Sequence, residues 1–365
     1  MFLSFIFYIF ELENNCMAKF NLNLENGILE YLKEFHNKSS KDIYEGLHKI
    51  VAYATIKRTI QELLDKNFIE TIGKGKATKY LISKSLNVLY PINLETYFEK
   101  EIDDRIINET FNFKLIKEIF NEITIFTPNE IFKLSLLQDK FNTNISNLSK
   151  LEYYKEFERL AIDLSWKSSQ IEGNTYSLLE TERLLKEKET ASGKTKDEAV
   201  MLLNHKIALD FILENSDYIN PIQVSRIEDI HSLLIKDLGI DRNIRNRRVG
   251  ISGTNYIPLD NEFQIKEALQ ELCLLINSKK NIFEKSFLAL ILLSYIQPFS
   301  DGNKRTARII SNAILINNNY CPISFRTVDS LDYKKAMLVF YEQNNISAFK
   351  KIFIEQFEFA VKTYF

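Results

Sequence analysis

The residues best suited to chemistry lie in a polar turn between two apolar segments. Residues 283–295 (FEKSFLALILLSY) and 309–316 (IISNAILI) are apolar at helical spacing, and the turn between them contains Pro298, Asp301 and Gly302. This order predicts a helix, a turn and a second helix whose N-terminal end carries the charge. Free backbone N–H groups at a helix start, beside a glycine that lets the chain approach closely, form an anion-binding nest.

The charged side chains after this turn indicate which anion it would bind. Arg305 and Arg308 are three positions apart on the second helix, so both guanidinium groups can converge on the same phosphates. Asp301 is a hard oxygen ligand in the right place for a phosphate-bound magnesium ion. The turn is therefore predicted to hold a polyphosphate together with Mg²⁺.

The stretch 297–308 (QPFSDGNKRTAR) resembles the signature of the Fic (Fido) family, H-P-F-x-[D/E]-G-N-[G/K]-R-x-x-R. The matching positions are Pro298, Phe299, Asp301, Gly302, Asn303, Arg305 and Arg308. Gln297 stands where the family has its catalytic histidine. The resemblance covers roughly residues 150–365 and implies a mainly α protein with a Fic-type helical bundle core.

Fic proteins typically transfer AMP from ATP to a Ser, Thr or Tyr hydroxyl of a protein, so the resemblance implies ATP, Mg²⁺ and a protein target. In this sequence Asp301 would position the metal and Arg308 would reach the γ-phosphate. The nucleotide-binding residues that the resemblance implies are Gly302, Asn303, Lys304, Arg305 and Arg308. Lys304 leaves the transferred group open, because adenylylating members usually carry Gly there, whereas the Doc kinases carry Lys in a related motif.

Gln297 changes what such a site can do, because an amide is not basic near neutral pH. General base catalysis is worth roughly 10²- to 10⁴-fold. Two interpretations stay open: a slow or target-assisted adenylyltransferase, and a nucleotide-binding pseudoenzyme that regulates transcription through its N-terminal domain. A third is phosphodiester hydrolysis with Glu172 as the base.

An inhibitory motif is expected upstream of the turn. Ser168, Glu172 and Gly173 resemble the Fic inhibitory-helix motif, [S/T]-x-x-x-E-[G/N]. On a helix Ser168 and Glu172 are one turn apart on one face, and Gly173 is a natural helix stop. The resemblance implies that Glu172 pairs with Arg308 and so obstructs productive ATP binding.

A short hairpin is expected near residues 247–258. Val249 and Ile251 alternate around Gly250, and Ser252 begins a turn. In position this segment resembles the Fic flap, which pairs with an extended target segment by strand addition. An ordinary exposed loop is the alternative.

Residues 17–85 are interpreted as a winged helix-turn-helix domain, from three short helical patterns followed by alternating strands at 68–72 and 79–82. The residues that could contact DNA are Lys57, Arg58, Lys74 and Lys76. Because Glu62, Asp65 and Glu70 dilute this charge, a packing or dimerisation module is the alternative, and the sequence is compatible with a homodimer.

The composition sets the remaining expectations. The chain has 365 residues, 10 Gly, 6 Pro and a net charge of -2, which favours two or three mainly helical domains without a global field for nucleic acid or membrane. Three cysteines without paired spacing fit a reducing cytoplasm. Residues 86–150 are expected to be a helical connector, and 151–365 the Fic domain.

The N-terminus and the histidines complete these expectations. Residues 1–16 are interpreted as an upstream misreading of the start codon, because a second methionine follows at Met17. The apolar run at residues 2–10 within them is too short to span a bilayer. His205 and His231 are interpreted as packing or surface residues, because neither has a carboxylate or cysteine at metal spacing.

Overall fold

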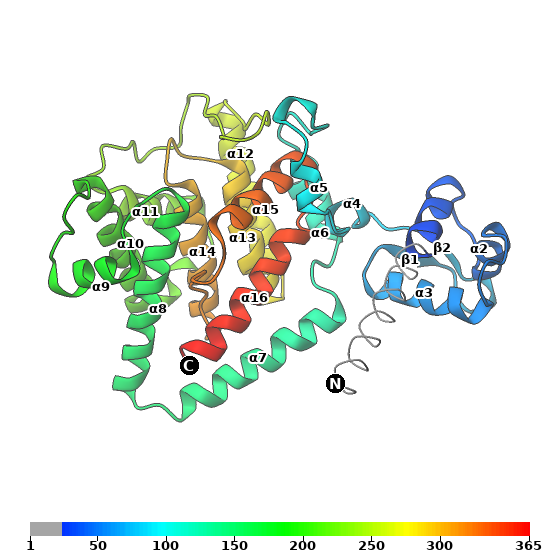
Figure 1. Cartoon of the computed structure of the whole chain (residues 1–365), viewed down its shortest axis with the longest axis horizontal. Coiled ribbons are helices and arrows are strands. Elements are labelled where there is room, and N and C mark those ends of the chain that lie inside the picture. Colours follow the sequence, from blue (N-terminus) through cyan, green and yellow to red (C-terminus); the bar gives the residue numbers. More distant parts are fainter. Residues whose placement is uncertain (1–23) are drawn as a thin grey trace, which may run out of the picture. The chain divides into compact units, whose positions relative to one another are not determined.

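The computed structural model describes residues 24–365, in two compact units that divide between Tyr90 and Pro91 (Figure 1). The interpretations of residues 1–16 and 2–10 fall outside the described residues. Within residues 24–365, no helix combines the length and the apolar character that crossing a membrane requires.

The first unit has the predicted order of helices followed by a hairpin. A helix covers residues 24–34, and the elements after it are α2 (Ser40–Gly46), α3 (Tyr53–Asp65), β1 (Ile69–Ile72), η1 (Gly75–Ala77), β2 (Lys79–Ile82) and α4 (Leu86–Leu89). The two strands are antiparallel, with Ile69 opposite Ile82 and Ile72 opposite Lys79. The unit is therefore winged-helix-like, with the hairpin as its wing.

The core of the first unit follows the helical spacing of its apolar residues. Ile56, Ile60 and Leu63 of α3 are buried on one face. Ser39 caps α2 and forms a capping box with Asp42.

The second unit is built from helices, whose bounds are as follows: α5 Leu94–Phe98, η2 Ile102–Asp104, η3 Leu115–Ile119, α6 Phe120–Glu122, α7 Pro128–Ser146, α8 Lys150–Ile171, α9 Leu178–Glu187, α10 Lys196–Glu214, η4 Ser216–Ile219, α11 Val224–Ile235, α12 Glu262–Ser278, α13 Ile282–Ile296, α14 Asn303–Asn317, α15 Ser330–Gln343 and α16 Ser347–Thr363. The predicted mainly α fold is confirmed.

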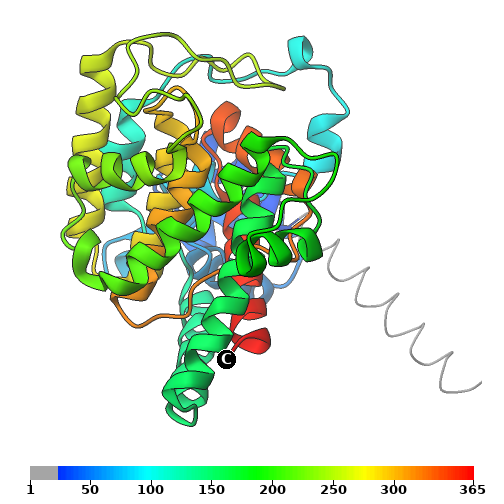
Figure 2. The same cartoon turned by 90° about the vertical axis from the view of Figure 1, so that its left-hand side faces the viewer.

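Helix α13 is the centre of the second unit. Its residues are buried on every side, as expected for a helix that is apolar all round. It packs along α14, and α12 covers another side of it. In Figure 1 this pair lies between the green helices α8, α10 and α11 and the red helix α16, and Figure 2 looks onto the green helices.

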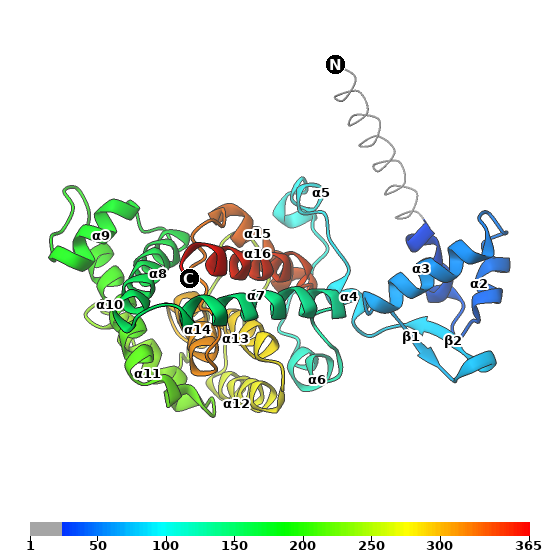
Figure 3. The ribbon, with the colours of Figure 1, turned by 90° about the horizontal axis from the view of Figure 1, so that it is seen from below.

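Two further contacts close the helical bundle. Helix α7 runs beside α16, as Figure 3 shows from below. Helix α15 packs on α16 and also contacts α8, α13 and the short α5. Residues 91–105, which precede this bundle in sequence, are thus in the same unit as the motif.

The expected flap hairpin is wrong as a strand assignment. Residues 249–251 form no strand, and the segment turns at Ser252 and Gly253 without pairing to itself. Its one ladder contact is an isolated parallel bridge from Ile257 to Thr110. The downstream arm bonds to a different part of the chain, so the upstream arm has no neighbouring strand.

Candidate functional site

The backbone of the motif loop is shaped by its two ends. Gln297 caps α13 in the left-handed conformation with a φ of 52°, and Gly302 begins α14 with a φ of 80°. A Cβ atom on Gly302 would lie 3.3 Å from Ile235 and 3.4 Å from His231. Both the positive φ and this close packing therefore favour glycine at the position. Buried Arg245 donates from Nε to the Gln297 carbonyl at 2.6 Å and from its backbone to the Pro298 carbonyl at 3.0 Å.

His231 of α11 holds the middle of this loop. Its ring stacks on Phe299 with the centroids 3.6 Å apart. Its Nε2 lies 3.0 Å from the carbonyl oxygen of Asp301, which can only accept, so Nε2 carries the proton. Burial lowers the pKa of His231 to about 4, and the ring is therefore neutral at physiological pH. From the sequence His231 is interpreted as a packing or surface residue; it is a packed residue, and its hydrogen bond to the loop was not foreseen.

The Gln297 side chain is fully engaged by the protein and is 8% exposed. Its Nε2 donates to the Ser294 carbonyl at 2.8 Å, and its Oε1 accepts from Asn303 Nδ2 at 3.1 Å. Asn303 also donates to the carbonyl of Phe299 and accepts from its N–H, both at 2.8 Å. The amide thus ties the end of α13 to the start of α14.

Arg305 is a buried cation with unused hydrogen-bonding capacity. The side chain is 2% exposed, and its Nη2 lies 3.3 Å from Asp301 Oδ2. Within residues 24–365 its buried Nε and Nη1 atoms have no partner. An unsatisfied buried guanidinium is costly, so this side chain is poised for an anion.

Arg308 is completely buried, and each of its three side-chain nitrogen atoms has a partner. It donates from Nε to Ser168 Oγ at 2.8 Å, from Nη2 to the Ser168 carbonyl at 2.9 Å and from Nη1 to Tyr333 Oη at 3.2 Å. Its Nη2 also lies 2.8 Å from Glu172 Oε1. The expected contact between Glu172 and Arg308 is present, whereas its inhibitory effect remains a prediction.

Glu172 follows α8 as its C-cap and is held by two cations. Besides Arg308, Lys304 Nζ lies 3.3 Å from Glu172 Oε2. Burial alone would raise the pKa of the Glu172 carboxyl, but the positive charges of Arg308 and Lys304 outweigh it, so the pKa lies below its usual value. Gly173 then leaves the helix with a φ of 100°. The sequence analysis predicted Lys304 only as a nucleotide-binding residue and did not foresee its contact with Glu172.

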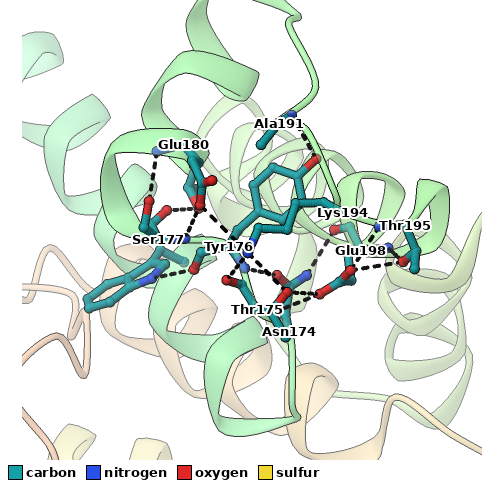
Figure 4. A network of polar contacts seen from close by, with 11 residues as sticks. Asn174, Thr175, Tyr176, Ser177, Glu180, Ala191, Lys194, Thr195 and Glu198 are labelled. Carbon is teal, nitrogen blue, oxygen red and sulfur yellow. Dashed lines mark hydrogen bonds and ion pairs between the residues drawn. The ribbon is translucent and has the colours of Figure 1, made fainter.

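The chain after Gly173 is fastened to the start of α10, as Figure 4 shows. The carboxylate of Glu198 accepts from the hydroxyl and the N–H of Thr175, each at 2.7 Å, and from the hydroxyl and the N–H of Thr195 at the helix N-cap. Asn174 Nδ2 donates to the Glu198 carbonyl at 2.9 Å. The hydroxyl of Thr175 and the backbone of Thr195 lower the pKa of Glu198 to about 2.

A cavity of about 550 Å³ opens beside the motif loop. Four segments and Glu172 line it: the loop with the start of α14, the flap at 249–253, α15, and residues 98–105. The sequence analysis missed the last two segments, of which the charged members are Lys100, Glu101, Arg105, Lys334 and Lys335. No local pattern marks them, because they become neighbours only through the packing of α15 on α5.

Asp301 suits a metal that arrives with its ligand. Among the described residues, no group of three His, Cys, Asp or Glu side chains could hold a metal by itself. The Asp301 side chain is 63% exposed at the cavity, with Oδ1 accepting from the Gly302 N–H at 2.6 Å. Mg²⁺ is commonly held by one or two carboxylates and substrate phosphates, so the residues fit a phosphate-bound ion.

The four DNA-contact candidates are exposed on the first unit. Lys57 and Arg58 lie on α3, where Lys57 stands over the Tyr53 ring and Arg58 lies 3.6 Å from Glu62. Lys74 and Lys76 lie in the turn between the two strands. Their contact with DNA remains a prediction.

Two family models match parts of this chain. Residues 221–315 match the model of the Fic/DOC family, and residues 23–106 match the model of the Penicillinase repressor. The expected Fic/DOC domain is thus confirmed for the segment that carries the motif, and the second match supports the winged-helix interpretation.

Curated relatives resemble a little under half of the chain. The Protein adenylyltransferase Fic of Nematostella vectensis is 30% identical over 174 residues, which are 46% of this chain and 40% of that protein. The protein of the same name in Aedes aegypti is 28% identical over 167 residues, 43% of this chain and 32% of that protein. The chain therefore spans less than half the length of these relatives.

Solved structures show the same fold at low identity. A fragment of Fic-1 from C. elegans superimposes with a TM-score of 0.56 at 21% identity, covering 65% of this chain and 72% of that chain. A Fic family protein from Desulfovibrio desulfuricans G20 has a TM-score of 0.56 at 20% identity, with 66% and 74% covered. The second unit therefore has a Fic fold.

Proposed function

We propose that the Fic/DOC domain of this chain binds ATP and transfers AMP to a hydroxyl of a protein, slowly and under inhibition by Glu172. The observation that carries the proposal is Arg305, a buried guanidinium with two unpaired nitrogen atoms at the edge of a 550 Å³ cavity. The relatives named protein adenylyltransferase support the same reaction.

Each motif residue would bind a different part of the nucleotide. The nest at Gly302 and the guanidinium of Arg305 would hold the α- and β-phosphates, and Arg308 would hold the γ-phosphate. Asp301 would hold Mg²⁺, which supplies charge neutralisation on the phosphates. The cavity has room for the nucleotide beside the flap.

Gln297 would limit the rate of transfer. Its amide cannot accept the proton of an attacking hydroxyl, and both of its polar atoms already bond to protein. Positioning and charge stabilisation would remain, so transfer would be slower than with a histidine by roughly 10²- to 10⁴-fold. Because Lys304 occupies the position where the Doc kinases carry Lys, transfer of phosphate instead of AMP is the alternative reaction for this site.

Inhibition would follow from the competition for Arg308. Glu172 already supplies the negative charge that this buried guanidinium needs, and Lys304 holds the second carboxylate oxygen. A γ-phosphate in the same place would meet a carboxylate instead of a free cation. Productive binding would then require Glu172 to move away.

The test is a titration of ATP with Mg²⁺ against the full chain and its Glu172→Ala variant. The variant is expected to bind about tenfold more tightly or better, equivalent to about 1.4 kcal/mol. Without nucleotide it should melt at a lower temperature, because Arg308 loses its buried counter-charge.

Glu262→Ala is the matched control, since Glu262 is a partly exposed residue of α12 that pairs with Lys266. It should bind ATP like the unchanged protein. Equal, weak binding by all three proteins would remove the inhibitory role of Glu172. No binding by any of them would remove the proposed function.

A second candidate function is DNA binding by the first unit, in line with the regulator interpretation. It is favoured by the winged-helix-like fold and by the match of residues 23–106 to the Penicillinase repressor model. Exposed lysines on α3 and in the wing would contact phosphates. Such a protein would use the Fic domain as a nucleotide-binding regulator.

A further inference from the structure

A buried ion pair lies behind the flap, outside the motif. Arg105 follows η2, and Glu342 lies near the end of α15. Their side chains are 3% and 1% exposed. Their nearest atoms, Arg105 Nη1 and a Glu342 oxygen, are 3.2 Å apart. Two charges are costly to bury, and such a pair is kept where it is hydrogen-bonded and fixes an arrangement.

The same guanidinium holds the turn of the flap. Arg105 Nη2 donates to the Gly253 carbonyl at 2.8 Å. Gly253 has a φ of 91°, and a Cβ atom there would come within 3.3 Å of Leu338 of α15. The flap turn therefore sits close against α15, and Arg105 bridges the two.

Further contacts make the segment around Arg105 a brace. On one side Tyr97 donates its hydroxyl proton to Glu342 at 2.6 Å. On the other side Asn255 donates to Asp103 at 2.9 Å, and the Ile257 N–H donates to the Glu109 carbonyl at 2.8 Å. Residues 97–109 thus connect the end of α15 to the downstream arm of the flap.

Residues 249–251, between the two ends of the flap, lack such support. Within the described part of the chain, no backbone hydrogen bond is made by Val249, Gly250 or Ile251, although all three line the cavity. On their upstream side the nearest contact is from Arg245 Nη1 to the Arg247 carbonyl at 2.8 Å, and on their downstream side the turn is held by Arg105. An edge without partners is also the part that an extended target could pair with.

We propose that Arg105 is a positioning residue for the flap: its fork of donors joins Glu342 to the Gly253 carbonyl and so sets the place of residues 249–251 beside the nucleotide cavity. The role of the flap in docking a protein target rests on the proposed function. The attachment of the flap to α15 does not.

The test uses Arg105→Lys in the full chain. An ammonium keeps a positive charge for Glu342, but it lacks the planar fork that reaches two acceptors at once. Arg247 and Arg248 are exposed in the flap, so trypsin can report on its mobility. Cleavage after these residues is expected to accelerate about fivefold or more, because local opening becomes easier.

Cleavage after exposed Lys188, beyond α9, is the internal reference and should keep its rate. Arg326→Lys is the matched control. Arg326 Nη1 lies 3.1 Å from Asp163 Oδ2, in an ion pair outside the flap. If Arg105→Lys leaves flap cleavage unchanged, the proposal is overturned. It is equally overturned if cleavage at the flap and at Lys188 rises together, since Arg105 would then support only general stability.

A second variant covers the case in which Arg105→Lys fails to fold. Arg105→Gln combined with Glu342→Gln removes both buried charges, so no unpaired one is left. It should again open the flap selectively. A titration with ATP and Mg²⁺ on the same samples separates the two proposals, because absent nucleotide binding would sink the proposed function while the cleavage result still decides the role of Arg105.

Discussion

Gln297 occupies the position where the chemistry of this site departs from the family signature. The structure uses its side chain as a structural link between Ser294 and Asn303. A histidine at the same place could keep one such bond and offer its other ring nitrogen to a hydroxyl proton. The loop around it is also held by Arg245 and His231, which bond to the carbonyl groups of Gln297 and Asp301.

Gln297→His is therefore expected to restore transfer. In a Glu172→Ala background, labelling of protein by labelled ATP should rise roughly 10²- to 10⁴-fold. Gln297→Met in the same background is the control, because it removes the amide without adding a base, and it should stay slow.

The outcomes separate the interpretations of Gln297. If the histidine variant stays unlabelled, a latent adenylyltransferase site is wrong. If Glu172→Ala alone already labels fully, the pseudoenzyme interpretation is wrong. Thin-layer separation of the products would distinguish transferred AMP from transferred phosphate.

At the scale of elements, the end of α8 is held in place by α10. Glu172 ends α8, and the chain that follows is tied down through Thr175 and Asn174 to Glu198 (Figure 4). These contacts lie two and three residues after Glu172, whose carboxylate meets Arg308. Weakening them should loosen the α8–α9 connection.

Glu198 predicts a pH dependence of stability. Its pKa in the folded protein is lowered to about 2, against a usual value near 4.3. A depressed carboxyl pKa contributes stability above the unfolded-state pKa, and this contribution is lost as the pH falls towards 2. The difference in unfolding free energy between the unchanged protein and Glu198→Gln should thus be full at pH 6 and shrink below about pH 4.

Urea unfolding at several pH values measures this difference. Glu187→Gln is a suitable control, since Glu187 is an exposed residue at the end of α9. A difference that stays constant from pH 6 to pH 3 would contradict the assignment of the effect to ionised Glu198.

At the scale of the whole molecule, the chain combines a winged-helix-like unit with a Fic fold. The net charge is only -2, so attraction to DNA would have to come from local groups. The candidates Lys74 and Lys76 lie at the wing, where a phosphate backbone is commonly contacted.

The full chain is expected to bind duplex DNA with strong salt dependence. Lys74→Glu with Lys76→Glu should weaken binding across sequences and reduce the slope of log K against log salt by about one per lysine lost from a phosphate. Lys351→Glu on α16 is the control for a change of charge elsewhere. Fluorescence anisotropy measures this, and no binding at low salt would leave the packing-module alternative.

The amino-acid sequence by itself determined the parts of this protein that depend on near neighbours. The motif turn, the helix that presents Ser168 and Glu172 on one face and the order of the winged-helix unit all follow from periodicity and from residues within a few positions of one another. For the same reason, the sequence alone shows that a non-basic amide, Gln297, stands at the position of the family histidine.

Only the tertiary structure decided which distant groups meet. Arg105 reaches Gly253 and Glu342, Lys304 reaches Glu172, and the flap bonds to residue 109 instead of to itself. These partners are separated by more than one hundred residues of sequence, and nothing local distinguishes them from other charged or apolar positions. The packing of buried helices brings them together, because an unpaired charge is costly to bury and a paired one is tolerated.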